Sequence, residues 1–150
     1  MAKDIIIYTD GSCFPNPGPG GYGAVIIYPD KKEKWISGGF NNTTNNRMEL
    51  FAVIKSIEIF KKPCNIFLYS DSEYIINGIS RWLDNWIKHR KVMKNMDLWR
   101  IIYDFKQKHN IITGWVRGHS GNKYNELTFH IILDNNYYAI CKCFGELIFN

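Results

Sequence analysis

The chain has 150 residues, of which 45% are hydrophobic and 22% are charged, and it carries a formal net charge of +5. This length predicts a single domain, and this composition argues against a disordered or low-complexity protein. The apolar runs are short and Asp4 follows the N-terminus closely, so we expect a cytoplasmic protein with neither a membrane span nor a secretory signal. The four cysteines show no metal-finger spacing, which predicts free thiols.

The first half of the chain predicts a strand meander followed by a helix. Apolar and β-branched runs indicate three strands, over residues 4–10, 22–28 and 33–40. The first two are joined by a Gly/Pro stretch that is too short for a helix, which predicts an antiparallel pair. Asn and Thr side chains at 41–46 can cap a helix over 47–60, and Pro63 ends it.

The second half of the chain predicts helical crossovers between further strands. The expected elements are a strand over 65–69, a helical stretch from 72 to about 89, a helix over 97–108 and a strand over 111–116. A loop at 117–122 and a terminal segment follow. This order predicts an α/β fold with a mixed sheet, in which antiparallel strands come first and parallel strands follow.

Positive charge is concentrated in one segment of the chain. Between Arg81 and Arg100, six basic and two acidic residues give a net charge of +4 and are interleaved with tryptophans. Trp82 and Trp86 are four residues apart, so they share a face if the segment is helical. A basic stripe with aromatic side chains suits a nucleic-acid backbone, whereas the alternative is a solvated helix whose tryptophans pack on the core. Charge alone does not decide between the two interpretations.

Three acidic residues occupy matching places in the predicted topology. Asp10 ends the first strand, Asp71 follows the fourth strand, and Glu49 lies in the first turn of the helix between them. A right-handed crossover makes these strands parallel neighbours, so the three carboxylates meet. Their repulsion implies protonation or a bound cation, and oxygen ligands favour Mg²⁺ or Mn²⁺. Two such ions would stabilise the attacking and leaving oxygens of a phosphodiester displacement, whereas the alternative is that each acid alone serves as a capping or turn residue.

Six motifs follow one another along the chain: TDGS at 9–12, CFPNPGPGGYG at 13–23, TTNNRMEL at 43–50, YSDSEYIINGI at 69–79, KNMDLW at 94–99 and WVRGHSGNKYNE at 115–126. Together they resemble the motifs of type 1 ribonuclease H, in the same order and at similar spacing. The resemblance implies a ribonuclease H-like fold, with a five-stranded mixed sheet flanked by helices. It also implies an enzyme that hydrolyses the RNA strand of RNA/DNA hybrids endonucleolytically, using two Mg²⁺ ions that Mn²⁺ can replace. We expect a monomer without an obligatory protein partner.

The resemblance assigns roles to individual residues. Asp10, Glu49 and Asp71 match three of the family's four metal ligands and are the expected catalytic carboxylates. His119 matches a mobile catalytic histidine, and Glu126 matches an accessory acidic residue near the site. The residues expected to bind the hybrid are Thr44 and Asn95 at a phosphate, Asn16, Asn45 and Asn46 at the minor groove, and Trp82, Trp86 and Lys88 in the basic aromatic segment.

One position departs from the family pattern. The family's fourth metal ligand is an aspartate three residues after Glu126, and this chain has Phe129 there, a residue that cannot ligate a metal. Asp134 lies five residues further on, about 140° around a helix, so it does not replace that ligand. We therefore expect weakened hydrolysis, and the alternative function is an RNA/DNA hybrid-binding protein with weakened or lost cleavage.

The resemblance ends abruptly near residue 127. We expect a ribonuclease H-like domain over residues 1–127 and a divergent C-terminal tail over 128–150 that packs on this domain or extends it. The basic segment between Trp86 and Asn95 is shorter than in bacterial relatives with a full basic protrusion. Four basic residues remain at 88–94, so we expect hybrid binding to persist and to depend on salt.

Overall fold

A computed structural model describes residues 2–118 and 121–134 of the chain. Its single sheet has the strand order β3-β2-β1-β4-β5. The strands are β1 (Lys3–Cys13), β2 (Gly18–Ile27), β3 (Glu33–Thr43), β4 (Cys64–Ser70) and β5 (Asn110–Trp115). The helices are α1 (Asn45–Ile57), α2 (Glu73–Asn77), α3 (Leu83–Lys88), α4 (Met96–Lys108) and α5 (Lys123–Asp134), with a π-helical segment (Gly78–Trp82) between α2 and α3.

The strand pairing confirms the predicted mixed sheet. β1 pairs with β2 and β2 pairs with β3 in antiparallel orientation, whereas β1 pairs with β4 and β4 pairs with β5 in parallel orientation. The two parallel pairs are joined by helical crossovers, the first through α1 and the second through the helices from α2 to α4.

Some element boundaries differ from the sequence prediction. β2 begins at Gly18 rather than at residue 22. Its ladder with β1 continues to the pair Cys13–Gly20, and Gly18 pairs with Thr43 of β3, although glycine has a low strand propensity. The helical stretch expected from 72 is divided, and the division begins at Gly78. A Cβ atom at Gly78 would collide with the Trp99 ring, so the ring of another helix packs directly against the backbone where the division begins.

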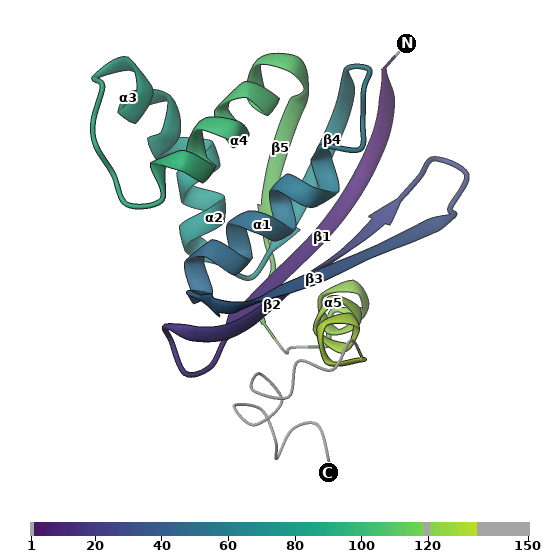
Figure 1. Ribbon diagram of the computed structural model, residues 1–150. Helices are drawn as coiled ribbons and strands as arrows, with labels where there is room; N and C mark the ends of the chain where they lie inside the picture. The colour runs from purple at the N-terminus through teal and green to yellow at the C-terminus, as the bar shows by residue number, and fades with distance from the viewer. Residues whose placement is uncertain (1, 119–120, 135–150) are drawn as a thin grey trace.

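Alternation along β1 sends side chains to two faces of the sheet. Ile5 and Ile7 are fully buried in the main core, which α1, α2 and α4 complete. Ile6 and Tyr8 belong to a separate cluster that includes Tyr124 of α5. Figure 1 shows the same division, with α1 and α4 on one face of the sheet and α5 on the other.

The last helix crosses the position where the family resemblance ends. α5 continues through residue 127 to Asp134, so the domain boundary predicted after 127 falls within a helix. Residues 135–150, which form most of the predicted tail, lie outside the described residues. Within the described ranges, no helix has both the length and the apolar composition that a membrane span requires.

The parallel pairing of β1 and β4 brings their carboxyl ends to one edge of the sheet. Tyr8 pairs with Tyr69 across the two strands, and Asp10 and Asp71 each lie two residues beyond this pair. α1 packs against β1 and β2, with its first turns near the same edge. The topology thus gathers acidic residues from three separate elements.

Candidate metal centre and nucleic-acid interface

The three predicted carboxylates lie together at the ends of β1 and β4. Asp10 comes from β1, Glu49 from α1 and Asp71 from the turn after β4, and one oxygen of each lies within 4.8 Å of the others. Asp10 and Glu49 are both 7% exposed, whereas Asp71 is half-buried. The structure therefore brings together side chains that are as many as 61 residues apart in the sequence.

One backbone amide joins two of these carboxylates. The N–H of Gly11 donates to Oδ1 of Asp10 at 2.9 Å and to Oε1 of Glu49 at 2.8 Å. This close approach of β1 to α1 requires glycine, because a Cβ atom at Gly11 would collide with the backbone of Met48 and Glu49. The sequence motif TDGS thus supplies both a carboxylate and the residue that lets α1 approach it.

The carboxylates are costly to keep charged without a cation. Burial raises the pKa of Asp10 from its ordinary 3.8 to about 7, first by desolvation and then through the charge of Asp71. Desolvation, followed by the charge of Asp10, also raises the pKa of Glu49 well above its ordinary value. A divalent cation would relieve both effects. The donor set fits such an ion, because three carboxylates are hard oxygen ligands of the kind that Mg²⁺ and Mn²⁺ prefer.

The end of β5 and the loop after it press against Asp71. The indole Nε1 of Trp115 donates to the backbone carbonyl of Asp71 at 3.0 Å. At Gly118 a Cβ atom would lie 2.7 Å from Oδ2 of Asp71, so a larger residue there would displace the carboxylate. The motif that contains His119 therefore begins beside the candidate metal centre.

Five residues predicted to bind the hybrid line one cavity of about 310 Å³. The lining residues are Asn16, Pro17, Thr44, Asn45, Asn46, Lys94 and Asn95. Asn16 accepts from the N–H of Asn45 at 3.1 Å, which ties the loop between β1 and β2 to the start of α1. Among the lining residues Lys94 alone carries a formal charge, so the cavity suits an anion such as a phosphate.

The tryptophans of the basic segment fall into two classes. Trp99 is fully buried, and Trp86 packs edge-on against it with ring centroids 5.6 Å apart. Trp82 packs against Trp86 with ring centroids 6.0 Å apart. Trp82 is also 41% exposed, so part of its side chain lies on the surface. Two tryptophans of the segment therefore pack on the core, as the second interpretation expects. Trp82 and exposed Lys88 face solvent, and their contact with nucleic acid stays a prediction.

A comparison with known protein families identifies the family to which this chain belongs. A family model described as RNase H matches residues 2–131. The chain belongs to the RNase H family. It is 50% identical over 133 residues to Ribonuclease HI of Haemophilus influenzae, which covers 85% of this chain and 86% of that protein. It is 48% identical over 130 residues to Ribonuclease H of Alcanivorax borkumensis, covering 83% of this chain and 85% of that one.

Solved structures agree with this membership of the RNase H family. LC9-RNase H1, described as a type 1 RNase H with the type 2 active-site motif, has a TM-score of 0.79 and 28% identity, over 89% of this chain and 72% of that chain. LC11-RNase H1 in complex with RNA/DNA hybrid has a TM-score of 0.67 and 25% identity, over 87% of this chain and 98% of that chain. The relatives and the fold together identify a bacterial type 1 member of this family of metal-dependent endoribonucleases.

Three positions of the RNase H pattern near the C-terminus differ in how far the structure describes them. Glu126 lies in the first turn of α5 and contributes to the raised pKa of Asp10, so its carboxylate is near the cluster. Phe129 lies on α5 three residues later, and its side chain lies outside the described residues. His119 also lies outside them.

Sequence reasoning missed several residues around the RNase H site. Lys94 was expected only as one of the basic residues at 88–94, and its place in the anion cavity beside Asn95 was missed, although it stands at the start of the KNMDLW motif. Arg47 and Tyr74 bond to Asn95 from two other helices. They stand within TTNNRMEL and YSDSEYIINGI, but no periodicity or spacing indicates that these segments meet.

Proposed function

We propose that the chain hydrolyses the RNA strand of RNA/DNA hybrids, using divalent metal ions held by Asp10, Glu49 and Asp71. The observation that carries this proposal is the convergence of the three carboxylates at one edge of the sheet in a member of the RNase H family. The names of the relatives, Ribonuclease H and HI, support the reaction. The complex of LC11-RNase H1 with an RNA/DNA hybrid supports the substrate.

The metal centre supplies the chemistry and the protein supplies the geometry. Two Mg²⁺ ions, or Mn²⁺ in their place, would stabilise the attacking water and the departing 3′ oxygen of the RNA strand when bound. Gly11 orients Asp10 and Glu49 through its amide, and Gly118 leaves room for Asp71. Water adds to the scissile phosphorus and the bond to the 3′ oxygen breaks. We assign proton transfer near the reacting phosphate to His119.

The surface beside the metal centre positions the hybrid. The anion cavity takes a phosphate of the DNA strand at Thr44, Lys94 and Asn95. Asn16, Asn45 and Asn46 lie in the same cavity wall and contact the minor groove, where the 2′-hydroxyl distinguishes RNA from DNA. In the basic aromatic segment, Trp82, with Trp86 packed behind it, and Lys88 meet the backbone further along.

A second function is favoured by the residue at the fourth ligand position. Because Phe129 offers no ligand oxygen, this RNase H holds its metal ions with one carboxylate fewer than its family pattern. A chain that keeps its anion cavity but holds metal weakly would bind hybrids and cleave them slowly. An RNA/DNA hybrid-binding protein whose catalysis is weakened is therefore the second candidate. For both candidate functions we expect the protein to be cytoplasmic and monomeric.

Cleavage of an end-labelled RNA/DNA hybrid tests the proposal. The full chain is assayed with Mg²⁺, with Mn²⁺ and with chelator, beside the variants Asp10→Asn and Asp104→Asn. Asp104 is an exposed acid on α4, so its variant matches the change in charge away from the site. Cutting of the RNA strand that needs metal, disappears in Asp10→Asn and persists in Asp104→Asn supports the enzyme. Tight binding without cutting supports the second candidate. A chain that neither binds nor cuts the hybrid would contradict both candidates.

A further inference from the structure

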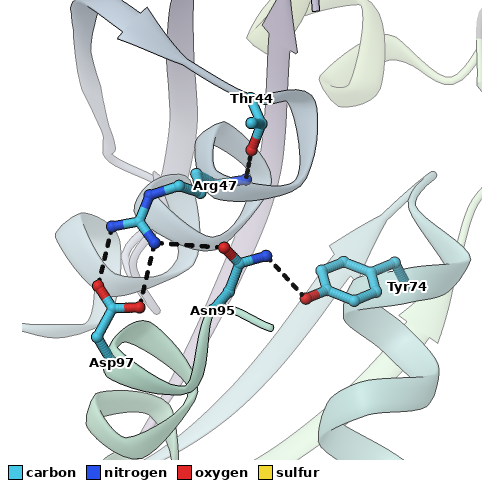
Figure 2. A network of polar contacts seen from close by, with 5 residues as sticks. All are labelled: Thr44, Arg47, Tyr74, Asn95 and Asp97. Atoms are coloured by element: carbon cyan, nitrogen blue, oxygen red, sulfur yellow. Dashed lines mark hydrogen bonds and ion pairs between the residues drawn. The ribbon is translucent and has the colours of Figure 1, made fainter. Parts of the chain in front are cut away.

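A polar network at the rim of the anion cavity joins three helices. Arg47 comes from α1, Tyr74 from α2, and Asn95 and Asp97 from the start of α4, as Figure 2 shows. Neither Arg47 nor Tyr74 lines the cavity, whereas Asn95 does. Both side chains reach the cavity wall through their hydrogen bonds to Asn95.

Arg47 is held in place by a bidentate ion pair. Its Nη1 and Nη2 donate to the two carboxylate oxygens of Asp97 at 3.1 and 2.9 Å. A planar guanidinium fixed in this way has a defined orientation, which a lysine ammonium would not have. Its backbone N–H is also bonded, to Oγ1 of the N-cap residue Thr44 at 3.2 Å. Arg47 is thus tied to both helices whose first residues line the cavity.

The carboxamide of Asn95 is bonded on both sides. Its Oδ1 accepts from Nη1 of Arg47 at 3.3 Å, and its Nδ2 donates to the hydroxyl of Tyr74 at 3.2 Å. Because a guanidinium only donates, the amide oxygen must face Arg47 and the amide nitrogen must face Tyr74. One hydrogen of Nδ2 is used by Tyr74, and the second one bonds to no residue in the described part of the chain, so a ligand in the cavity can accept from it.

Tyr74 is anchored in turn by the core. Its hydroxyl oxygen accepts from the indole Nε1 of Trp99 at 2.8 Å, and the two rings pack edge-on at 5.3 Å. Trp99 is fully buried. The Asn95 amide is therefore held, through Tyr74, by Trp99, which cannot move without disturbing the core.

We propose that Arg47 and Tyr74 are positioning residues that fix the carboxamide of Asn95, so that its free N–H meets a phosphate of the nucleic-acid backbone. The proposal rests on the proposed function for the identity of that phosphate. Arg47 lies two residues before Glu49, and Tyr74 lies three residues after Asp71. The same two residues thus link the anion cavity to the segments that carry Glu49 and Asp71. They keep the cavity at a fixed position relative to the carboxylate cluster.

The test is a thermodynamic cycle on hybrid binding, measured with chelator so that no cleavage is needed. The dissociation constant of a fluorescent RNA/DNA hybrid is compared for wild type, Tyr74→Phe, Asn95→Ala and the double variant. Loss of one hydrogen bond predicts a dissociation constant raised roughly 2- to 10-fold by Tyr74→Phe. In the Asn95→Ala background the same change is expected to have an effect of less than about 1.5-fold. Equal effects of Tyr74→Phe in both backgrounds would overturn the proposal.

A second pair of variants separates positioning from folding. Tyr74→Phe leaves the buried Trp99 N–H without its acceptor, so its folding is checked by urea denaturation. Arg47→Lys keeps the charge and the Trp99 bond but loses the defined orientation, and it is expected to raise the dissociation constant in the same range. Tyr103→Phe on α4 is the matched control, because Tyr103 packs against the same core and its hydroxyl bonds no residue within the described ranges. An unchanged dissociation constant in Arg47→Lys, or a raised one in Tyr103→Phe, would contradict the proposal.

Side-chain NMR decides the network even if the substrate assignment fails. In wild type the Asn95 amide signals are expected to be those of an ordered group, and in Tyr74→Phe and Arg47→Lys they are expected to show increased mobility. The side-chain amide of Asn46, which lines the same cavity, serves as the internal reference. A wild-type protein that binds no hybrid would remove the proposed function, whereas unchanged Asn95 mobility in both variants would remove the network proposal.

Discussion

The backbone N–H of Gly11 donates to Oε1 of Glu49 at 2.8 Å and thereby joins the end of β1 to the first turns of α1. The same N–H lies 2.9 Å from Oδ1 of Asp10. Two carboxylates that repel each other thus share one donor, which holds them close together. The geometry of the candidate metal centre therefore depends on the closeness of β1 to α1.

Gly11→Ala is expected to destabilise the protein and to weaken metal binding. A Cβ atom at this position would collide with the backbone of Met48 and Glu49, so α1 must move away from β1. Overpacking of this kind costs about 1–3 kcal/mol in the free energy of unfolding, which urea denaturation measures. Mg²⁺ titration of the same variant is expected to show reduced affinity. Ser12→Ala, on the same strand, is the control, and a Gly11→Ala protein with wild-type stability and affinity would contradict the packing argument.

Asp10→Asn is expected to stabilise the metal-free protein at high pH. The folded state raises the pKa of Asp10 from 3.8 to about 7, so the folded protein binds this proton more tightly than the unfolded chain. The resulting stability is complete below pH 4 and is lost as the pH rises through about 7. With chelator at pH 8, Asp10→Asn is expected to exceed wild type by on the order of 2–4 kcal/mol in the free energy of unfolding.

The comparison at two pH values makes this prediction specific. At pH 4 the two proteins are expected to unfold at similar urea concentrations, because Asp10 is then protonated in the folded wild type. Asp104→Asn, which removes an exposed acid, is expected to follow wild type at both pH values. Addition of Mg²⁺ at pH 8 is expected to stabilise wild type and not Asp10→Asn. A difference that is the same at pH 4 and pH 8 would show that the burial of the Asp10 charge is not its cause.

Topology made the carboxylate cluster predictable from the sequence. Apolar runs located the strands, and a right-handed crossover between Asp10 and Asp71 required their strand ends to be neighbours. Glu49 followed from its place in the first turn of the intervening helix. The roles expected for the nearby polar residues came from the family resemblance. The structure gathers five of these residues around one cavity.

Contacts between distant segments set the limit of prediction. The break in the helix at Gly78 coincides with the Trp99 ring, which packs there from another helix. The ion pair of Arg47 with Asp97 joins residues 50 positions apart, and neither its existence nor its role in orienting Asn95 leaves a periodic signal. The strand at Gly18 was missed because its backbone pairing outweighs the low strand propensity of glycine.

The exposed basic segment is expected to control the salt dependence of hybrid binding. Lys88, Arg90 and Lys91 are all exposed around the end of α3. Each lost phosphate contact lowers the slope of log K against log salt by about 0.9, so the triple alanine variant is expected to reduce the slope by about 1 to 3. Binding measured at several salt concentrations tests this. A triple alanine variant at exposed Lys34, Lys61 and Lys62 has the same net charge and is expected to keep a slope closer to wild type. Equal slopes for the two variants would assign the effect to net charge alone.

Phe129→Asp is expected to increase cleavage of the RNA strand with Mg²⁺. α5 continues through residue 129, so an aspartate there lies one helical turn after Glu126 and on the same side of the helix. Glu126 is near enough to Asp10 to raise its pKa, which places this side of α5 toward the carboxylate cluster. A restored ligand is expected to raise the Mg²⁺-dependent rate by about tenfold or more, in the range that metal-site substitutions commonly change activity.

Phe129→Asn separates the ligand from the loss of the aromatic ring. Both substitutions remove the phenylalanine and add a polar group of the same size, but only the aspartate adds a negative charge that a hard divalent ion favours. The gain is therefore expected in Phe129→Asp and not in Phe129→Asn, and to be greater with Mg²⁺ than with Mn²⁺. Equal rates in the two variants would show that residue 129 does not face the metal ions, and that the metal centre is formed without a ligand from this position.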